Sequence, residues 1–197
     1  MTESGALKRY SIGAATGVVV VSLMIGSAGP ALARPAFPDT TDDDFQSECL
    51  AKHNQLRERH GVPAMTISPK LVAHAKKRVQ ELSMEEGLTA GYQGNQDSGF
   101  GENISWKATN TPGYNYACGD AVQAWYSEVD NYRFGEEGHQ RRTEEFTQVV
   151  WKSSTELGCA RASGKGTNWA GESYVLCSYS PSGNYGGKYK DNVPAQQ

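Results

Sequence analysis

The chain has 197 residues, of which 38% are hydrophobic and 21% are charged, and its formal net charge is −3. This length fits one domain with a sizeable core. A mildly acidic chain without a basic cluster is a poor partner for nucleic acid or for an anionic membrane surface, so we exclude both partner classes. The four cysteines suit two disulfides in an exported protein and allow three pairings. Their spacing shows no Cys-x-x-Cys or Cys/His pattern of a zinc site.

Residues 1–33 have the three-part layout of a secretory signal peptide. Lys8 and Arg9 precede a largely apolar run from Ile12 to Ile25, and small residues follow as far as Ala33. The alternative is an uncleaved signal anchor. A spanning helix needs about 20 apolar residues, however, and two serines and a proline interrupt this stretch. We therefore expect cleavage after Ala33, secretion of the protein, and no stable membrane insertion after cleavage.

Two helices are predicted in the first half of the exported part. Residues 34–44 are predicted to be a disordered leader, and the three aspartates at its end favour a helix N-terminus directly after it. A helix is predicted over 45–60, where Cys49 and Leu56 share one stripe with two histidines at steps of three and four. A second helix is predicted from Ser68-Pro69 to Gly87, because apolar residues recur there at helical spacing.

A loop, a strand and a third helix are predicted next. Residues 89–101 combine glycines with polar residues, which is typical of a loop. Ile104 and Trp106 indicate a short strand. Residues 117–132 carry apolar side chains at three- and four-residue steps and are predicted to form the helix.

The last third of the chain is predicted to end in two short strands. Residues 146–151 are ambiguous, because their β-branched side chains also suit a strand. Residues 157–162 and 174–179 are the two predicted strands, each bounded by glycines and serines. Residues 192–197 are expected to fray.

Five segments in this order carry a family resemblance. They are His53-Asn54-Gln55-Leu56-Arg57, Gly101-Glu102-Asn103-Ile104, Ala124-Trp125-Tyr126-Ser127-Glu128-Val129-Asp130-Asn131-Tyr132, Glu145-Phe146-Thr147-Gln148-Val149-Val150-Trp151-Lys152 and Tyr174-Val175-Leu176-Cys177-Ser178-Tyr179-Ser180-Pro181-Ser182-Gly183-Asn184-Tyr185. The chain resembles the CAP superfamily, which holds the plant pathogenesis-related-1 proteins, the cysteine-rich secretory proteins, the venom antigen-5 proteins and the yeast Pry proteins. The resemblance places a CAP domain over 45–193 and leaves 194–197 as a tail.

The resemblance implies an α+β fold, a three-layer α-β-α sandwich with a small antiparallel sheet between helices. It also decides that residues 146–151 are helical. Cys159 and Cys177 are expected to form a disulfide, because they lie in predicted neighbouring strands and because similar CAP proteins bridge these positions. Cys49 then pairs with Cys118.

CAP domains commonly build a central cleft from two histidines and two glutamates, a set that can hold a divalent metal. The resemblance assigns the two carboxylates to Glu102 and Glu128. Glu145 stands where the family has one histidine, and no histidine occurs at 89–92, where the other is expected. Zinc prefers imidazole nitrogen, so we predict no metal and no cofactor. One alternative is that a shifted loop brings His139 to the position of the family histidine that Glu145 replaces. Another is that the three glutamates lie close together, which would raise the pKa of at least one of them or favour binding of calcium.

Aromatic side chains around the end of the third helix are the second candidate site. Sterol-binding members of the family have an aromatic-rich loop here, so the resemblance assigns Tyr132, Phe134 and Phe146 to ligand binding. Flat rings suit a planar apolar ligand. Tyr126 and Tyr132 equally suit packing of the helix onto the sheet. Phe134, beyond the helix end, is the better ligand candidate.

The sequence therefore predicts a secreted extracellular binding protein that takes a sterol or a fatty acid and is not an enzyme. One alternative is a host- or partner-directed effector or defence protein that recognises another protein through its surface loops. Another is a hydrolase or a calcium-binding protein that uses the cleft glutamates. The missing histidines, and the lack of a Gly-x-Ser-x-Gly nucleophile motif, count against the hydrolase.

Overall fold

The structure, a computed structural model, describes residues 34–85, 87–88 and 99–197. The predicted signal peptide, and the segment where a family histidine is expected, lie outside the described residues. Within these ranges, no helix combines the length and the apolar character that crossing a membrane requires.

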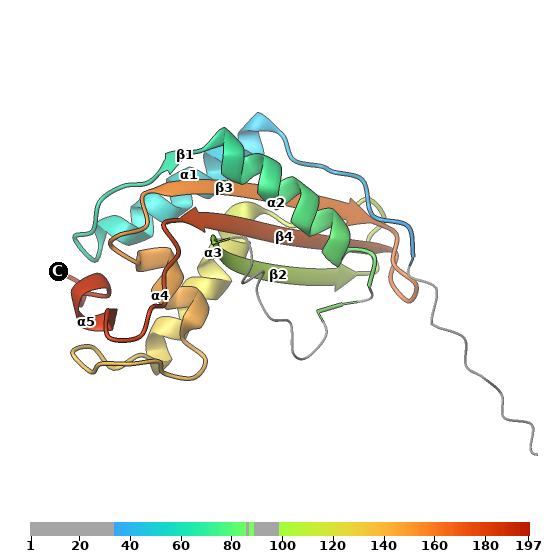
Figure 1. The fold of residues 1–197 in the computed structure, drawn as a ribbon. Helices are drawn as coiled ribbons and strands as arrows, with labels where there is room; N and C mark the ends of the chain where they lie inside the picture. Colours follow the sequence, from blue (N-terminus) through green and yellow to red (C-terminus); the bar gives the residue numbers. More distant parts are fainter. Residues whose placement is uncertain (1–33, 86, 89–98) are drawn as a thin grey trace, which may run out of the picture. The chain divides into compact units, whose positions relative to one another are not determined.

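A four-stranded sheet lies between helices (Figure 1). Its strand order is β1-β3-β4-β2. The strands are β1 (Thr66–Ile67), β2 (Gly101–Thr109), β3 (Glu156–Gly164) and β4 (Gly171–Ser180). β2 and β3 run antiparallel to β4, as predicted, whereas the short β1 pairs parallel with β3. The sheet is therefore mixed rather than purely antiparallel, and β2 is longer than the short strand predicted around Ile104 and Trp106.

The predicted helices all form, within a few residues of the expected ends. The helical elements are α1 (Asp43–Glu58), α2 (Pro69–Leu82), α3 (Cys118–Tyr126), the 3-10 helix η2 (Ser127–Asn131), α4 (Glu144–Val150) and α5 (Tyr189–Asn192). The aspartates before α1 act as expected, because the Asp42 side chain accepts a hydrogen bond of 2.7 Å from the Phe45 N–H. Residues 146–151, ambiguous by propensity, lie mostly in α4.

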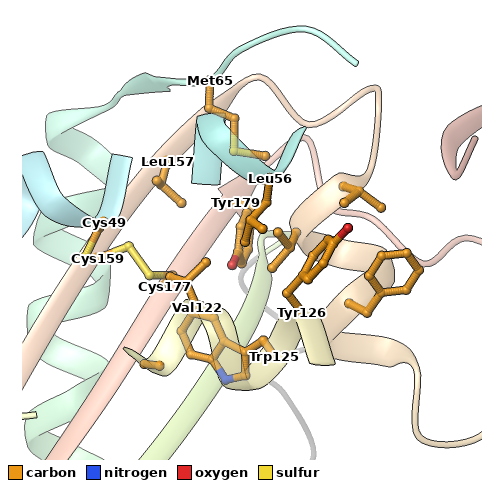
Figure 2. Close-up of a cluster of buried hydrophobic side chains, with 14 of the residues drawn as sticks. Cys49, Leu56, Met65, Val122, Trp125, Tyr126, Leu157, Cys159, Cys177 and Tyr179 are labelled. Atoms are coloured by element: carbon orange, nitrogen blue, oxygen red, sulfur yellow. A yellow bond between two sulfur atoms is a disulfide. The ribbon is translucent and has the colours of Figure 1, made fainter. Parts of the chain in front are cut away.

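The two faces of the sheet bury different clusters. Along β4, Tyr174 and Leu176 pack with α2 residues, whereas Val175, Cys177 and Tyr179 pack with residues of α1, α3 and α4. This alternation follows from the two-residue period of a strand. The α-β-α layering is the one that the sequence predicts, and Figure 2 shows the larger cluster.

Both disulfides form as predicted. Cys49 of α1 is bonded to Cys118 at the start of α3, and Cys159 is bonded to its cross-strand neighbour Cys177. The first bridge joins two helices, and the second joins β3 to β4. All four cysteines are fully buried.

The leader prediction for 34–44 differs from the structure, where this segment packs onto the domain. Arg34 donates to the carboxylate of Glu172 at 2.7 Å and to the Tyr174 hydroxyl at 2.9 Å. Phe37 is only 6% exposed, and Asp39 forms a bridge with Ala162. The physical reason is that the Glu172 carboxylate is fully buried and needs a cationic partner. Arg34 lies far from Glu172 along the chain, so the sequence does not indicate this contact.

The fraying predicted for 192–197 is also not seen. His60 Nδ1 lies 2.7 Å from the Pro194 carbonyl oxygen, and the Gln197 N–H donates to the Arg59 carbonyl at 2.9 Å. The Gln196 side chain donates to the Tyr126 hydroxyl at 2.8 Å. The tail is held because its polar groups find partners directly after α1 and at the end of α3.

Candidate functional site

Glu128 and Glu145 form a carboxyl pair at the start of α4. Glu128, in η2, accepts hydrogen bonds from the Glu145 N–H at 3.0 Å and from the Phe146 N–H at 3.2 Å. These are N–H groups that the first turn of a helix leaves without internal partners. Glu128 therefore caps α4 and fixes it to the end of the third helix, which gives this carboxylate a structural task.

The Glu145 carboxyl is strongly perturbed by this neighbourhood. Burial raises its pKa to about 8, and a hydrogen bond to Glu128 and the negative charge of Glu128 act in the same direction. Glu145 thus keeps its proton near neutral pH and donates it to the Glu128 carboxylate. The arrangement is a shared-proton pair rather than two free carboxylates.

Glu102 lies on a different face from this pair. Its carboxylate is 3.4 Å from Nε of Arg78 and 3.7 Å from Nδ1 of His74, and both of these residues belong to α2. The next residue, Asn103, points toward α4 and donates to the Glu145 carbonyl at 2.9 Å. Strand alternation therefore separates Glu102 from the face that carries Glu145.

Two histidines are packed inside the fold, and His139 lies on its surface. His53 is fully buried, with Nδ1 2.7 Å from the Cys49 carbonyl oxygen and Nε2 2.9 Å from the Tyr179 hydroxyl. His60 is also fully buried, and its Nε2 lies 2.9 Å from the Tyr126 hydroxyl. His139 does not stand in for Glu145, because its ring is exposed and lies 2.5 Å from the Glu144 carboxylate.

The predicted aromatic loop residues come together. The rings of Tyr132 and Phe134 are 5.0 Å apart, those of Tyr132 and Phe146 are 5.4 Å apart, and His60 and Tyr126 join the same group. Tyr132 and Phe146 are buried, whereas Phe134 is 37% exposed. We call these five residues the aromatic cluster. The sequence did not indicate His60 as a member, because it lies far from the others along the chain.

A comparison with protein families decides the identity of the fold. The model of the cysteine-rich secretory protein family, CAP, matches residues 50–179. The chain belongs to this family. The resemblance stated from the five motifs is thereby confirmed.

Relatives of this CAP domain occur in fungi and in animals. Secreted protein RBT4 of Candida albicans is 37% identical over 155 residues, which cover 75% of this chain and 38% of RBT4. Golgi-associated plant pathogenesis-related protein 1 of Homo sapiens is 31% identical, and the match covers 76% of this chain and 92% of that protein. Protein PRY2 of Saccharomyces cerevisiae is 30% identical, with 76% of this chain and 41% of PRY2 covered. The chain thus spans less than half the length of either fungal relative.

Solved structures agree on the fold. The structure titled NaASP2 with Zn2+ has a TM-score of 0.59 at 23% identity, covering 82% of this chain and 90% of that chain. MpPR-1i has a TM-score of 0.56 at 17% identity, covering 78% of this chain and 98% of that chain. Identity at this level supports the shared architecture alone.

The cleft residues of this CAP domain do not fit the family's metal site. Glu128 is committed to backbone N–H groups, Glu145 holds a proton, and Glu102 pairs with cationic Arg78. Across the described ranges, the four cysteines are the one set of three or more histidine, cysteine or acidic side chains whose ligand atoms gather within 4.8 Å. The acidic residues are therefore poor ligands for zinc, which prefers imidazole or thiolate.

The Glu145 carboxyl predicts a pH-dependent stability. Its pKa is about 8 in the fold and 4.5 in its ordinary state. Between these values the unfolded chain has lost this proton and the folded chain has kept it. The stabilisation is therefore complete below about pH 4.5 and is lost as the pH rises toward 8. The variant Glu145→Gln cannot ionise. The melting temperature of the variant minus that of the wild type should therefore increase between pH 5 and pH 8. Parallel melting curves across this range would contradict the assignment.

Proposed function

We propose that this CAP domain is a secreted binding protein for a sterol or a fatty acid, which it takes at the aromatic cluster. The predicted signal peptide supports export, and the name of the relative RBT4 describes that protein as secreted. The proposed activity is binding without chemistry, because the cleft glutamates are engaged in structural contacts.

The partial exposure of Phe134 is the observation that carries the proposal. Its ring is 37% exposed and stands edge-on to Phe146, with 6.2 Å between the ring centroids. The His60 ring lies 6.0 Å from the Phe134 ring, between their centroids. An apolar ligand that packs on Phe134 therefore meets a partly exposed ring that is backed by buried aromatic side chains at the rim of the core.

The Tyr132 hydroxyl favours a ligand with one polar end. It is buried and has no hydrogen-bond partner among the described residues, and burial raises its pKa to about 12, so it remains a neutral donor. A buried polar group without a partner costs about 1–3 kcal/mol. A sterol hydroxyl or a fatty-acid carboxyl would supply the missing partner.

The loop after Tyr132 also provides a polar rim. Arg133 and Glu136 lie on its surface and are 78% and 57% exposed. The loop is closed by a pair of hydrogen bonds between the Arg133 backbone and the Gln140 side chain, at 2.8 Å and 3.0 Å. An apolar contact with a charged rim is the usual anatomy of a site that holds an amphipathic molecule.

The test is saturation binding of radiolabelled cholesterol and of palmitate to the wild type and to Phe134→Ala. We expect saturable binding by the wild type and at least tenfold weaker binding by the variant, because the loss of a buried ring contact costs about 1.5–3 kcal/mol.

Trp169→Ala is the matched control. Trp169 is 39% exposed, close to the value for Phe134, but it lies in the hairpin between β3 and β4. Its removal should leave affinity unchanged. Equal losses in both variants would point to nonspecific adsorption on exposed rings. Absence of binding by the wild type would overturn the proposal and favour recognition of a protein partner.

A further inference from the structure

Two adjacent arginines lie in the loop that joins η2 to α4. Arg141 and Arg142 are both exposed, and the chain forms a turn there. Adjacent basic residues also occur in the sequence as Lys8-Arg9 and as Lys76-Lys77-Arg78. The first set lies outside the described residues, and the second lies inside α2. Within the described ranges, this loop is therefore the one place where a basic pair is presented outside a helix or strand.

Arg142 has a backbone conformation that suits glycine or asparagine better than arginine. Its φ is 60°, in the left-handed region. Two contacts within the same stretch hold it: Asn131 Nδ2 donates to the Arg142 carbonyl at 3.4 Å, and the Thr143 hydroxyl donates to the Gln140 carbonyl at 2.5 Å. An arginine in a strained and exposed position contributes little to packing, so its side chain is a candidate for recognition by a partner.

The contacts that close the end of this loop are local. The Gln140 side chain is bonded to the Arg133 backbone, and the Thr143 N–H donates to the Glu144 carboxylate at 2.8 Å. Thr143 itself is buried, so the peptide bond after the arginine pair becomes accessible when the end of the loop and the first turn of α4 open. Because these contacts lie near the surface and within a few residues of one another, this opening leaves the sheet intact.

We propose that Arg141-Arg142 is a processing site for an extracellular endoprotease that cuts after paired basic residues. Carboxylates in the binding pockets of such an enzyme suit the two guanidinium groups, which form bidentate hydrogen bonds with carboxylates. Water is the co-reactant: its oxygen adds to the Arg142 carbonyl carbon, and the bond to the Thr143 nitrogen breaks. The products are a carboxylate on Arg142 and an ammonium on Thr143. This ammonium forms next to the Glu144 carboxylate, which stabilises the cut form.

The fold would hold the two fragments together after the cut. Neither disulfide crosses the bond, because Cys49–Cys118 lies before it and Cys159–Cys177 lies after it. β2 comes before the cut and pairs with β4, which comes after it, over all nine of its residues. Cleavage therefore produces a two-chain protein that stays folded but separates on denaturation without a reductant.

The experiment treats the native, disulfide-bonded protein with a purified endoprotease specific for paired basic residues. We expect one cut, with Thr143 as the new N-terminus in mass spectrometry. The two fragments should elute together from gel filtration and separate on a denaturing gel without reductant. Cleavage through local opening should change in rate by less than twofold in urea below the unfolding transition, after correction for the activity of the protease on a short peptide. Cleavage through global unfolding would instead rise exponentially with urea.

Two variants locate the cut. Arg142→Asn removes the basic residue at the cut and suits the left-handed conformation, so it should fold normally and be cut at least a hundredfold more slowly. Lys77→Gln, in the basic set of α2, is the matched control and should be cut like the wild type. A native chain that stays intact under conditions that cut the unfolded chain after Arg142 would overturn the proposal. Cleavage in α2 at an equal rate, or a rate that follows global unfolding, would overturn it as well.

Discussion

Replacing Arg57 by methionine is expected to destabilise the domain by about 4 kcal/mol or more, because three buried carbonyl groups and one part-buried carbonyl group lose their donor. The Arg57 side chain is fully buried. It donates to the carbonyl oxygens of Pro63 at 2.8 Å and of Val149, Trp151 and Ser154 at 2.9 Å each. These acceptors lie in the loop after α1, at the end of α4 and in the turn before β3. One guanidinium thus joins three parts of the chain.

Methionine matches the arginine stem in length and polarity, so the effect isolates the guanidinium. Burial lowers the pKa of Arg57 to about 10, which still leaves it charged at neutral pH. The loss should approach the whole stability of a typical domain, about 5–15 kcal/mol. Urea unfolding measures it, with exposed Arg59→Met as the control that should change stability by less than about 0.5 kcal/mol. A loss below about 1 kcal/mol in Arg57→Met would contradict the assigned role.

The second large effect is expected for Gly158→Ala in β3. A Cβ atom at this position would lie 2.2 Å from the Val72 nitrogen and 2.3 Å from the Leu71 carbonyl carbon, both of which are backbone atoms of α2. Side chains can rotate away from an added methyl group, but the backbone of a packed helix cannot. The helix must lift from the sheet, so we expect a loss of about 3 kcal/mol, at the upper end for overpacking.

Gly186→Ala is the matched control for this change. Nothing lies within 4 Å of a Cβ atom built at Gly186, and its backbone has no positive φ. Its melting temperature should stay within about 2 °C of the wild type, whereas Gly158→Ala should melt at least 8 °C lower. Equal melting temperatures for the two variants would mean that α2 and β3 do not approach at Gly158.

Much of the fold follows from local pattern. The stripe on α1, the proline at the start of α2 and the glycines and serines that bound β4 predict these elements, because each signal depends on neighbours within a few residues. The cysteine pairing was predictable because two of the four lie in adjacent strands and because similar CAP proteins bridge these positions.

The segments that the local sequence pattern did not predict correctly are held by residues far away along the chain. The segment 34–44 is ordered by Glu172, and the tail after Val193 is ordered by His60 and Tyr126. A polar stretch has no hydrophobic period, so sequence alone assigns it to disorder. Short β1 escaped notice for the same reason, since its two residues pair with β3 far along the chain.

The sequence predicted which residues lie near one another in the candidate site, but only part of how they are arranged. The motifs predicted that Glu128 lies near Glu145 and that Tyr132, Phe134 and Phe146 lie together, and the structure has both arrangements. The motifs did not indicate that Glu102 would face α2, because the face of a strand residue depends on register. The nearness of the two disulfides was likewise invisible, since it depends on how α1 and α3 meet the sheet.

The most direct test of apolar-ligand binding is to map where a photoreactive cholesterol analogue attaches. The full-length protein is irradiated with the analogue and digested, and the labelled peptides are identified by mass spectrometry. Labels concentrated between Tyr132 and Phe146, competed by excess cholesterol and reduced in Phe134→Ala, are the predicted result. Labels spread evenly over the surface, or concentrated in the hairpin that carries Trp169, would contradict a binding site at the aromatic cluster.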